Sequence, residues 1–389
     1  MLLSLIVYSL TGAVLFFLGW HVNEREQRLL LQEGKELPFY SWEIMLSVLL
    51  FSIVAGARYH TGYDHAMYLD QYLHLQRTGD FSRHNFEYGF EGISRLFAFF
   101  DIHYFFYFAF WALLQIGLLY FGLRNHKHLL CWVGLGIMLG PYFVNWMNSM
   151  RQSVVVCAFV ALIPLIRDRK FVAYAIIVVL CAFIHKSALM LLPVFLICFV
   201  KFTDKIPSRW VLLTFFAAFV IIGAFPFWIK YVSNYEWFLN LTGYENYYNL
   251  DDPNVKGTLR MINWGPIRLL GLLSDVAMIW FYPDIKKHFS EDRLLPLFFT
   301  MALIGVCLSN LLMNTTHFIL RPVEYFLIFE LIITAYILCY LIKVKKIWML
   351  VLVSVLNFSY IYIAVVKAVY YPTRTSVPFL YHLFLYPSL

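Results

Sequence analysis

Charged residues are scarce in this 389-residue chain. Asp, Glu, Lys and Arg make up 14% of it, against about 25% in a typical soluble domain. Hydrophobic residues reach 61%, and the mean hydropathy is +0.70. A composition this apolar excludes an ordinary soluble domain and indicates an all-α polytopic membrane protein. The net charge of +7 is better explained by basic loops than by nucleic-acid binding, so we expect no nucleic-acid partner.

The sequence also lacks the short motifs of several other chemistries. Its six cysteines all fall inside apolar runs and form no CxxC pattern, so neither a disulfide framework nor a metal site is indicated. There is no Gly-rich P-loop for a nucleotide and no D-x-D motif for a divalent cation. We therefore expect no metal ion and no other cofactor.

Long apolar runs are the main feature that is present. Runs of about 15–23 residues, separated by charged residues, predict about twelve membrane helices in a single integral membrane domain that occupies residues 1–389. Two short neighbouring segments, 171–184 and 187–201, are alternatively a re-entrant or broken pair. The predicted spans are 3–20, 41–57, 102–123, 129–147, 150–166, 171–184, 187–201, 210–229, 265–282, 294–314, 322–342 and 347–368.

The distribution of Lys and Arg predicts which side of the membrane each loop faces. More than half of the 30 cations lie in one alternating set of short loops, which should be cytoplasmic by the positive-inside rule. Both termini and the two long loops, 58–100 and 230–264, are then expected on the outer side, where they would carry interfacial helices. The basic loops fall at 25–35, 124–127, 167–170, 201–209, 286–293 and 343–346.

A polar stripe interrupts the apolar sequence late in the chain. Its members are spaced four, three, four and three residues apart, as on one helix face. Ionisable groups this close to hydrocarbon are costly and persist mostly where they line a cavity or pathway. Arg321 precedes Pro322, which favours a first helical position, so we expect the guanidinium beside a helix N-terminus that suits anions. The stripe consists of Asn310, Asn314, His317, Arg321 and Glu324.

A second polar stripe ends at the outer boundary of a predicted helix. An arginine that only extends to the membrane surface needs no amides behind it, so this pattern indicates the wall of a pocket. A guanidinium fork can bind phosphate oxygens in bidentate fashion, which makes an anionic ligand the natural prediction. The stripe consists of Asn145, Asn148, Arg151 and Gln152.

Three ionisable residues on the outer side are candidate acids or bases. Asp64 follows Gly62, which predicts a tight turn that presents the carboxylate. Tyr68 shares a helical face with Asp64, although interfacial tyrosines commonly serve only as membrane anchors. Glu87 has no helical partner that would account for it as structure. His185 stands at the tip of an expected hairpin and can titrate near neutral pH, although a lone histidine is more often structural.

Other polar residues of the outer loops have simpler interpretations. Glu91 and Arg95 are four apart, which predicts an ion pair on an interfacial helix. The loop 230–264 is rich in aromatic residues and amides, a composition that suits sugar binding or a plain interfacial lid. Arg260 and Arg268 flank its return into the membrane and would add positive potential there.

In chain order, these motifs resemble those of the EpsG-like, Wzy-type polysaccharide polymerases. The matching residues are Arg58/Tyr59/Gly62/Asp64/Tyr68, Asn148/Arg151/Gln152, His185/Lys186/Ser187/Ala188 and Arg321/Tyr325/Phe326. The resemblance implies a GT-C-like membrane glycosyltransferase of the bacterial inner membrane. Its activity would join undecaprenyl-pyrophosphate-linked oligosaccharide repeats into O-antigen or exopolysaccharide at the periplasmic face. A flippase and a chain-length regulator are the implied partners.

The polymerase hypothesis assigns roles to the polar residues. Arginines can neutralise a pyrophosphate leaving group without a metal ion, and the predicted contacts are Arg151 and Arg321, with Arg260, Arg268 and Arg58 as further ones. The predicted catalytic base is Asp64, followed by His185 and Glu87. Nothing marks a covalent nucleophile, so we expect single displacement with inversion. The predicted glycan-binding or pocket-wall residues are Asn145, Asn148, Gln152, Asn314, His317, Tyr68 and Tyr325.

Two other classes of membrane protein are alternatives to a polymerase. A flippase or transporter of lipid-linked sugars would also use arginines, but it should show polar groups at mid-membrane depth and often repeats between its halves, and neither is evident from the sequence. A membrane O-acyltransferase should offer a nucleophile or base near a cytosolic acyl donor. The predicted inner loops offer mainly Lys and Arg.

Overall fold

The computed structural model describes residues 1–62, 64–82, 86–199, 207–225, 265–314, 320–372 and 379–383, and most of them are helical. The strands among these residues are β1, Arg58–Tyr59, and β2, His382–Leu383, which pair antiparallel with Arg58 opposite Leu383. The predicted helical class is confirmed. All six cysteines are free thiols.

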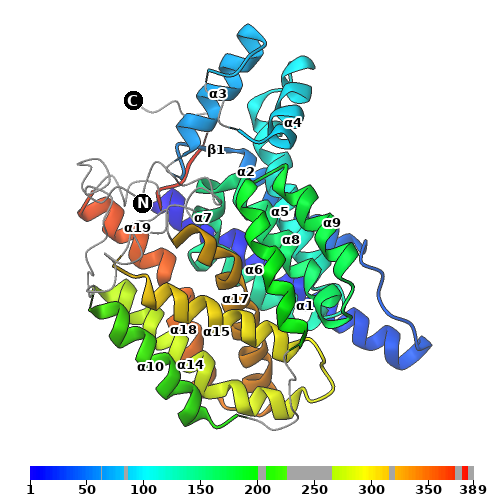
Figure 1. The fold of residues 1–389 in the computed structure, drawn as a ribbon, viewed down its shortest axis with the longest axis vertical. Coiled ribbons are helices and arrows are strands. Elements are labelled where there is room, and N and C mark those ends of the chain that lie inside the picture. Colours follow the sequence, from blue (N-terminus) through cyan, green and yellow to red (C-terminus); the bar gives the residue numbers. More distant parts are fainter. Residues whose placement is uncertain are drawn as a thin grey trace. The chain divides into compact units, whose positions relative to one another are not determined.

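The chain forms two compact units. Figure 1 shows the elements of both, coloured along the sequence. The first unit holds residues 1–161, 183–185 and 341–389. The second unit holds residues 162–182 and 186–340. Residues 183–185 therefore belong to the first unit although the helices on both sides of them belong to the second.

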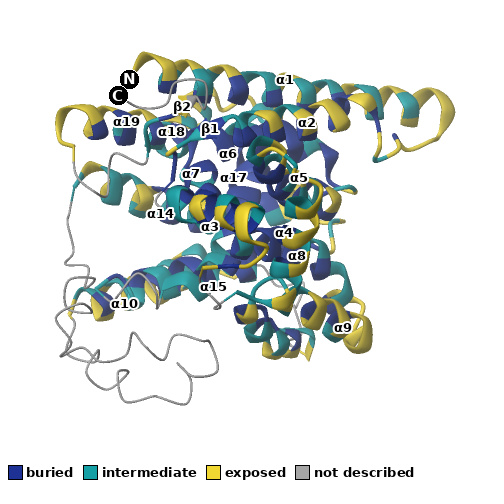
Figure 2. Cartoon of the chain, turned by 90° about the horizontal axis from the view of Figure 1, so that it is seen from above, coloured by how far each residue is buried: buried dark blue, intermediate teal, exposed yellow. Residues whose placement is uncertain are grey.

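Helix packing in the first unit follows from the apolar composition of its helices. In α6, every residue except Leu135 is buried, as expected for a short helix that is apolar all round, and Figure 2 shows it among buried neighbours. Aromatic rings fill the space between α3, α4 and α5; Tyr72 and Tyr107 stack at 4.1 Å between centroids, beside the fully buried Trp111. The elements are α1 Leu2–Glu33, α2 Trp42–Gly56, β1, α3 His65–Thr78, α4 Tyr88–Phe99, α5 Tyr104–Gly122, η1 Lys127–Leu129, α6 Leu130–Leu139, α7 Tyr142–Asn148, the first part of α8 Met150–Arg167, α18 Ile347–Phe358, α19 Tyr360–Tyr370 and β2.

The second unit is also helical. The hairpin of α9 and η2 is closed by Tyr174, whose hydroxyl donates to the Leu191 carbonyl at 2.6 Å. The Phe298 and Phe329 rings stack between α15 and α17. The elements are α9 Phe171–Ala182, η2 Lys186–Phe199, α10 Arg209–Ala224, α14 Pro266–His288, α15 Leu295–Leu311, η5 Arg321–Val323 and α17 Glu324–Lys343.

Several helices are long and apolar enough to cross a membrane. Within the described ranges there are four, at Leu2–Glu33, Tyr104–Gly122, Met150–Arg167 and Arg321–Lys343, or up to six if each bent helix pair counts as one span. The bent pairs are Lys127–Leu139 with Tyr142–Asn148, at 65°, and Ile347–Phe358 with Tyr360–Tyr370, at 41°. Each of the twelve predicted segments overlaps helical structure among the described residues. The shorter ones, such as α2 with 15 residues, rise only about 22 Å against about 30 Å of hydrocarbon, so twelve spans stay a prediction.

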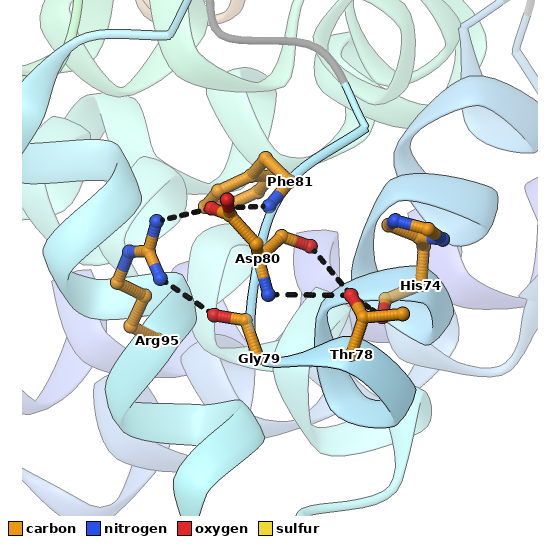
Figure 3. A network of polar contacts seen from close by, with 6 residues as sticks. All are labelled: His74, Thr78, Gly79, Asp80, Phe81 and Arg95. Atoms are coloured by element: carbon orange, nitrogen blue, oxygen red, sulfur yellow. Dashed lines mark hydrogen bonds and ion pairs between the residues drawn. The ribbon is translucent and has the colours of Figure 1, made fainter.

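Two helices, α3 and α4, occupy the loop 58–100, and the turn between them is held by polar contacts (Figure 3). Arg95 donates to the Asp80 carboxylate at 2.8 Å and to the Gly79 carbonyl at 2.7 Å. The predicted pair of Arg95 with Glu91 is therefore wrong, because the turn offers the guanidinium a carboxylate and a carbonyl together. The other long loop, 230–264, lies outside the described residues.

Candidate active site

The first segment that shapes the site is the turn before α3. Gly62 has φ 92°, and a Cβ there would come within 3.3 Å of the Met147 carbonyl carbon and oxygen. Glycine at this position therefore permits both the left-handed backbone and a close approach to α7. The turn aims the Asp64 N–H at the Asn148 side-chain oxygen, 2.9 Å away. The predicted turn before Asp64 is present, and it is tied to the end of α7.

The second segment is the break between α7 and α8. Helix α7 ends at Asn148, Ser149 leaves the helical conformation with ψ 51°, and α8 starts at Met150. Gln115 of α5, fully buried, donates to the carbonyls of Trp146 at 3.3 Å and Met150 at 3.1 Å. One side chain thus binds the backbone on both sides of the break.

This break changes the predicted polar stripe. Asn145 is exposed whereas Gln152 is 2% exposed, so the two amides do not line one wall. Asn148 is engaged with the turn before α3. The prediction of one polar stripe is wrong, because its helical spacing was carried across the break that the predicted spans 129–147 and 150–166 themselves leave.

The side chain of Arg151 meets partners from two other segments, and one of these partners also contacts a third segment. Its Nη1 forms an ion pair with Oε2 of Glu87, and its Nε donates to the Tyr68 hydroxyl at 3.3 Å. The other Glu87 oxygen, Oε1, lies 3.0 Å from Nδ1 of His185. We call Tyr68, Glu87, Arg151 and His185 the Glu87 cluster. All four were predicted site residues, and the fold brings them together from α3, the start of α4, α8 and the tip of the α9–η2 hairpin.

The position of His185 is set by backbone contacts of the hairpin tip. The Phe183 carbonyl accepts the N–H groups of Gly89, at 2.9 Å, and Phe90, at 3.3 Å, which are among the N–H groups that the first turn of α4 leaves without helical partners. A Cβ at position 89 would lie 2.7 Å from that carbonyl oxygen, so only glycine allows the approach. Glu87 is the N-cap residue of α4, and capping by Phe183 therefore brings His185 next to it.

The Glu87 cluster is mostly enclosed but not sealed. The side chains of Arg151, Glu87 and His185 are 16%, 17% and 12% exposed. Phe86 and Phe90 lie against the guanidinium at 4.8 and 5.2 Å from its central carbon, within cation–π range. Such surroundings strengthen electrostatic interactions.

The geometry of the cluster supports proton transfer. A carboxylate that accepts from Nδ1 of a neutral histidine fixes the tautomer, and Nε2 is then the basic nitrogen. Glu87 is in turn oriented by the positive charge of Arg151. Asp64, the first predicted base, contributes its backbone N–H to the contact with Asn148.

A second polar cluster lies in the second unit, among α14, α15 and α17. Arg268 donates to the Asn310 side-chain oxygen, and Asn310 Nδ2 donates to the Asp275 carboxylate at 3.0 Å. Ser274 donates to Glu330 at 3.1 Å. Asn310 is 1% exposed. Sequence reasoning missed the two acids, although a lone Asp or Glu inside an apolar run is a signal in itself.

The late polar stripe is not one helix face. Helix α15 ends at Leu311, and Asn314, beyond its end, donates to the Gly223 carbonyl at 2.8 Å. That prediction is wrong because the helix stops three residues earlier than assumed. Arg321 does start a helical segment with Pro322 in its first turn. Tyr325 is buried, and its hydroxyl lies 2.8 Å from that of Ser187.

Some predicted site residues have other placements. His317 and Arg260 lie outside the described residues. Arg58 is 1% exposed and lies within the first unit. Among the described residues, no three His, Cys, Asp or Glu side chains are grouped so as to hold a metal ion.

Comparison with known proteins gives one family. The model of the EpsG family matches residues 42–380, a range that contains every residue of the Glu87 cluster. No curated protein and no solved structure matches the chain.

Proposed function

This chain belongs to the EpsG family, and we propose that it is a membrane polysaccharide polymerase. Its donor would be an oligosaccharide repeat on undecaprenyl pyrophosphate, and its product an O-antigen or exopolysaccharide. The proposed location is the bacterial inner membrane, with about twelve spans, a GT-C-like arrangement and the Glu87 cluster on the periplasmic side. A flippase would supply the repeats, and a chain-length regulator would limit the product.

The Glu87 cluster supports a single-displacement reaction. His185 Nε2 takes the proton of an acceptor hydroxyl, whose oxygen forms a bond to the anomeric carbon of the donor sugar. The bond between that carbon and the pyrophosphate oxygen breaks, and its electron pair leaves with the lipid pyrophosphate. Attack opposite to the leaving group inverts the configuration. Glu87 orients His185 and stabilises the imidazolium that forms; Asp64 and Glu87 are the alternative bases.

The leaving group needs positive charge where its own negative charge develops. Arg151 supplies a fixed guanidinium next to the dyad of Glu87 and His185, and a preorganised cation in an enclosed site stabilises such a transition state strongly. Arg321, beside a helix N-terminus in the second unit, remains a proposed pyrophosphate contact. Arg260 and Arg268 remain further proposed contacts.

The observation that carries this proposal is the bridge that Glu87 makes between Arg151 and His185. To test it, the gene would be deleted in its host and complemented with wild type, Arg151→Ala or the control Arg95→Ala. Arg95 is exposed and pairs with Asp80 outside the cluster. We expect Arg151→Ala to abolish the long glycan ladder on a gel while single repeats still reach the lipid acceptor. An intact ladder in this variant would refute the assignment.

A flippase for lipid-linked oligosaccharides is the second candidate. The cluster of Arg268, Asn310 and Asp275 favours it, because buried ionisable groups in membrane helices often mark transport pathways. The same gel separates the two functions. Loss of every repeat, including the single one, would indicate transport.

A further inference from the structure

The most unusual buried group in the first unit is the guanidinium of Arg58. This side chain is 1% exposed, and only its Nη1 donates, to the Ala55 carbonyl. Its Nε and Nη2 atoms are buried without a hydrogen-bond partner among the described residues. The Phe108 ring lies 4.7 Å from the guanidinium carbon. A buried cation with unmatched donors costs several kcal/mol, so a matching acceptor is required.

A second donor lies against the same aromatic ring. His65 is fully buried, and its ring centroid is 4.9 Å from that of Phe108. Its Nδ1 accepts the His60 N–H at 3.2 Å, and the Arg58 backbone also hydrogen-bonds the ring, whose other nitrogen is Nε2. That Nε2 atom is also buried without a partner in the described part of the chain. The unmatched N–H groups of Arg58 thus lie near the ring of His65, which packs on the same Phe108 side chain.

The C-terminal strand closes this corner of the first unit. Tyr381 is 3% exposed, its hydroxyl donates to the Val54 carbonyl at 2.6 Å, and its N–H donates to Ser4 at 3.0 Å. Thr61 donates to the Leu380 carbonyl at 3.2 Å. The Val54 and Leu380 carbonyls therefore already accept hydrogen bonds from other side chains. None of the ion pairs among the described residues involves Arg58.

We propose that Arg58, together with His65, binds a small inorganic anion such as chloride in the interior of the first unit, beneath β2. An anion neutralises the guanidinium and accepts from several N–H groups at once, whereas a water molecule leaves the charge uncompensated. At 1% exposure, the Arg58 side chain is out of reach of a lipid pyrophosphate. Arg58 is therefore assigned here to a structural anion site and not to the donor substrate.

The test is the thermal unfolding of the purified full chain in detergent, with sodium chloride, sodium bromide or sodium gluconate at constant ionic strength. Gluconate is too bulky for the enclosed corner. Chloride or bromide would replace gluconate stepwise. We expect Tm to rise by about 3 °C for each tenfold increase in halide concentration above the dissociation constant. Equal Tm values in the three salts would mean that water serves the donors, and the proposal would be overturned.

Substitutions of arginine show whether the halide dependence of Tm comes from the proposed site. Arg58→Gln should remove the halide dependence, whereas Arg95→Gln, which changes an exposed arginine, should keep it. If Arg58→Gln does not fold, Arg58→Lys decides, because it keeps the charge and loses the planar fork. We expect the halide concentration for half of the Tm rise to increase about tenfold in Arg58→Lys. An unchanged halide response in these Arg58 variants would place the ion elsewhere and contradict the proposal.

Discussion

At the scale of single residues, Glu87 is the side chain on which the proposed chemistry depends most. It accepts from a guanidinium on one oxygen and lies within hydrogen-bond distance of an imidazole on the other. Neutralising it would leave Arg151 without its counter-ion and His185 without its orienting acceptor. The carboxylate therefore sets both the geometry and the charge balance of the cluster.

We predict that Glu87→Gln lowers the rate of glycosyl transfer by about 10²–10⁴-fold, the range of a lost acid–base contribution. The rate can be measured in membranes supplied with lipid-linked repeats. The matched control is Glu91→Gln, the same change one helical turn further along α4. A Glu87→Gln rate close to wild type would show that the dyad has no part in the reaction.

The imidazole of His65 predicts a pH dependence of stability. Burial, with smaller contributions from Arg58 and His60, lowers the pKa of His65 to about 2, and His382 is the other histidine near this corner. The unfolded chain takes up a proton below about pH 6.5 and the folded chain does not, so stability is present above pH 6.5 and falls below it. The loss is about 1.4 kcal/mol per pH unit, or about 2 kcal/mol at pH 5.

The comparison of His65→Phe with wild type measures this term. Phenylalanine keeps an aromatic ring against Phe108 and cannot titrate. We expect the decrease in Tm between pH 7 and pH 5 to be smaller in His65→Phe than in wild type. An equal decrease would assign the acid sensitivity to other groups.

At the scale of elements, the break between α7 and α8 positions the site. Without it, Asn148 and Arg151 would share one face; with it, Asn148 holds the turn before α3 and Arg151 reaches Glu87. The Gln115 side chain binds the backbone on both sides of the break. The orientation of Arg151 therefore depends on a residue of α5 that does not touch Glu87.

We predict that Gln115→Met, which keeps length and removes the amide that donates both hydrogen bonds, destabilises the chain by about 1–3 kcal/mol through the loss of these two buried hydrogen bonds. Because α8 then starts with less restraint, polymerisation should slow by at least tenfold even below the unfolding temperature. The control is Gln76→Met, at a side chain that bonds near the exposed end of α3. Unaltered polymer synthesis in folded Gln115→Met would show that the break between α7 and α8 does not affect the reaction.

The segment that leads into β2 gives a second prediction about an element. Tyr381→Phe removes the hydrogen bond to the Val54 carbonyl and should cost about 1–3 kcal/mol of unfolding free energy. Tyr371→Phe changes an exposed tyrosine and should leave Tm unchanged. Denaturant unfolding of both variants measures the difference. Equal midpoints would mean that the C-terminal strand adds little stability to the first unit.

At the scale of the whole molecule, the sequence predicted the helices well because apolar runs and their charged boundaries are local signals. It could not predict how distant side chains meet. Tyr68, Glu87, Arg151 and His185 were each candidates, but their assembly depends on the capping of α4 by Phe183 and on the break at Ser149. The stripe around Asn314 was misjudged for a related reason, since helical spacing was extended past the end of α15. Asp275 and Glu330 were not predicted, because each stands alone in an apolar run and is bonded by a residue of another helix.

The most direct test of the central claim is polymerisation by the purified chain, with lipid-pyrophosphate-linked repeats as the only substrate. We predict lengthening glycan and one lipid pyrophosphate released for each new linkage, with both lost in Glu87→Gln and His185→Asn and retained in Glu91→Gln. If the chain instead moves intact lipid-linked repeats across vesicle membranes and forms no linkage, it is a transporter and the account is contradicted.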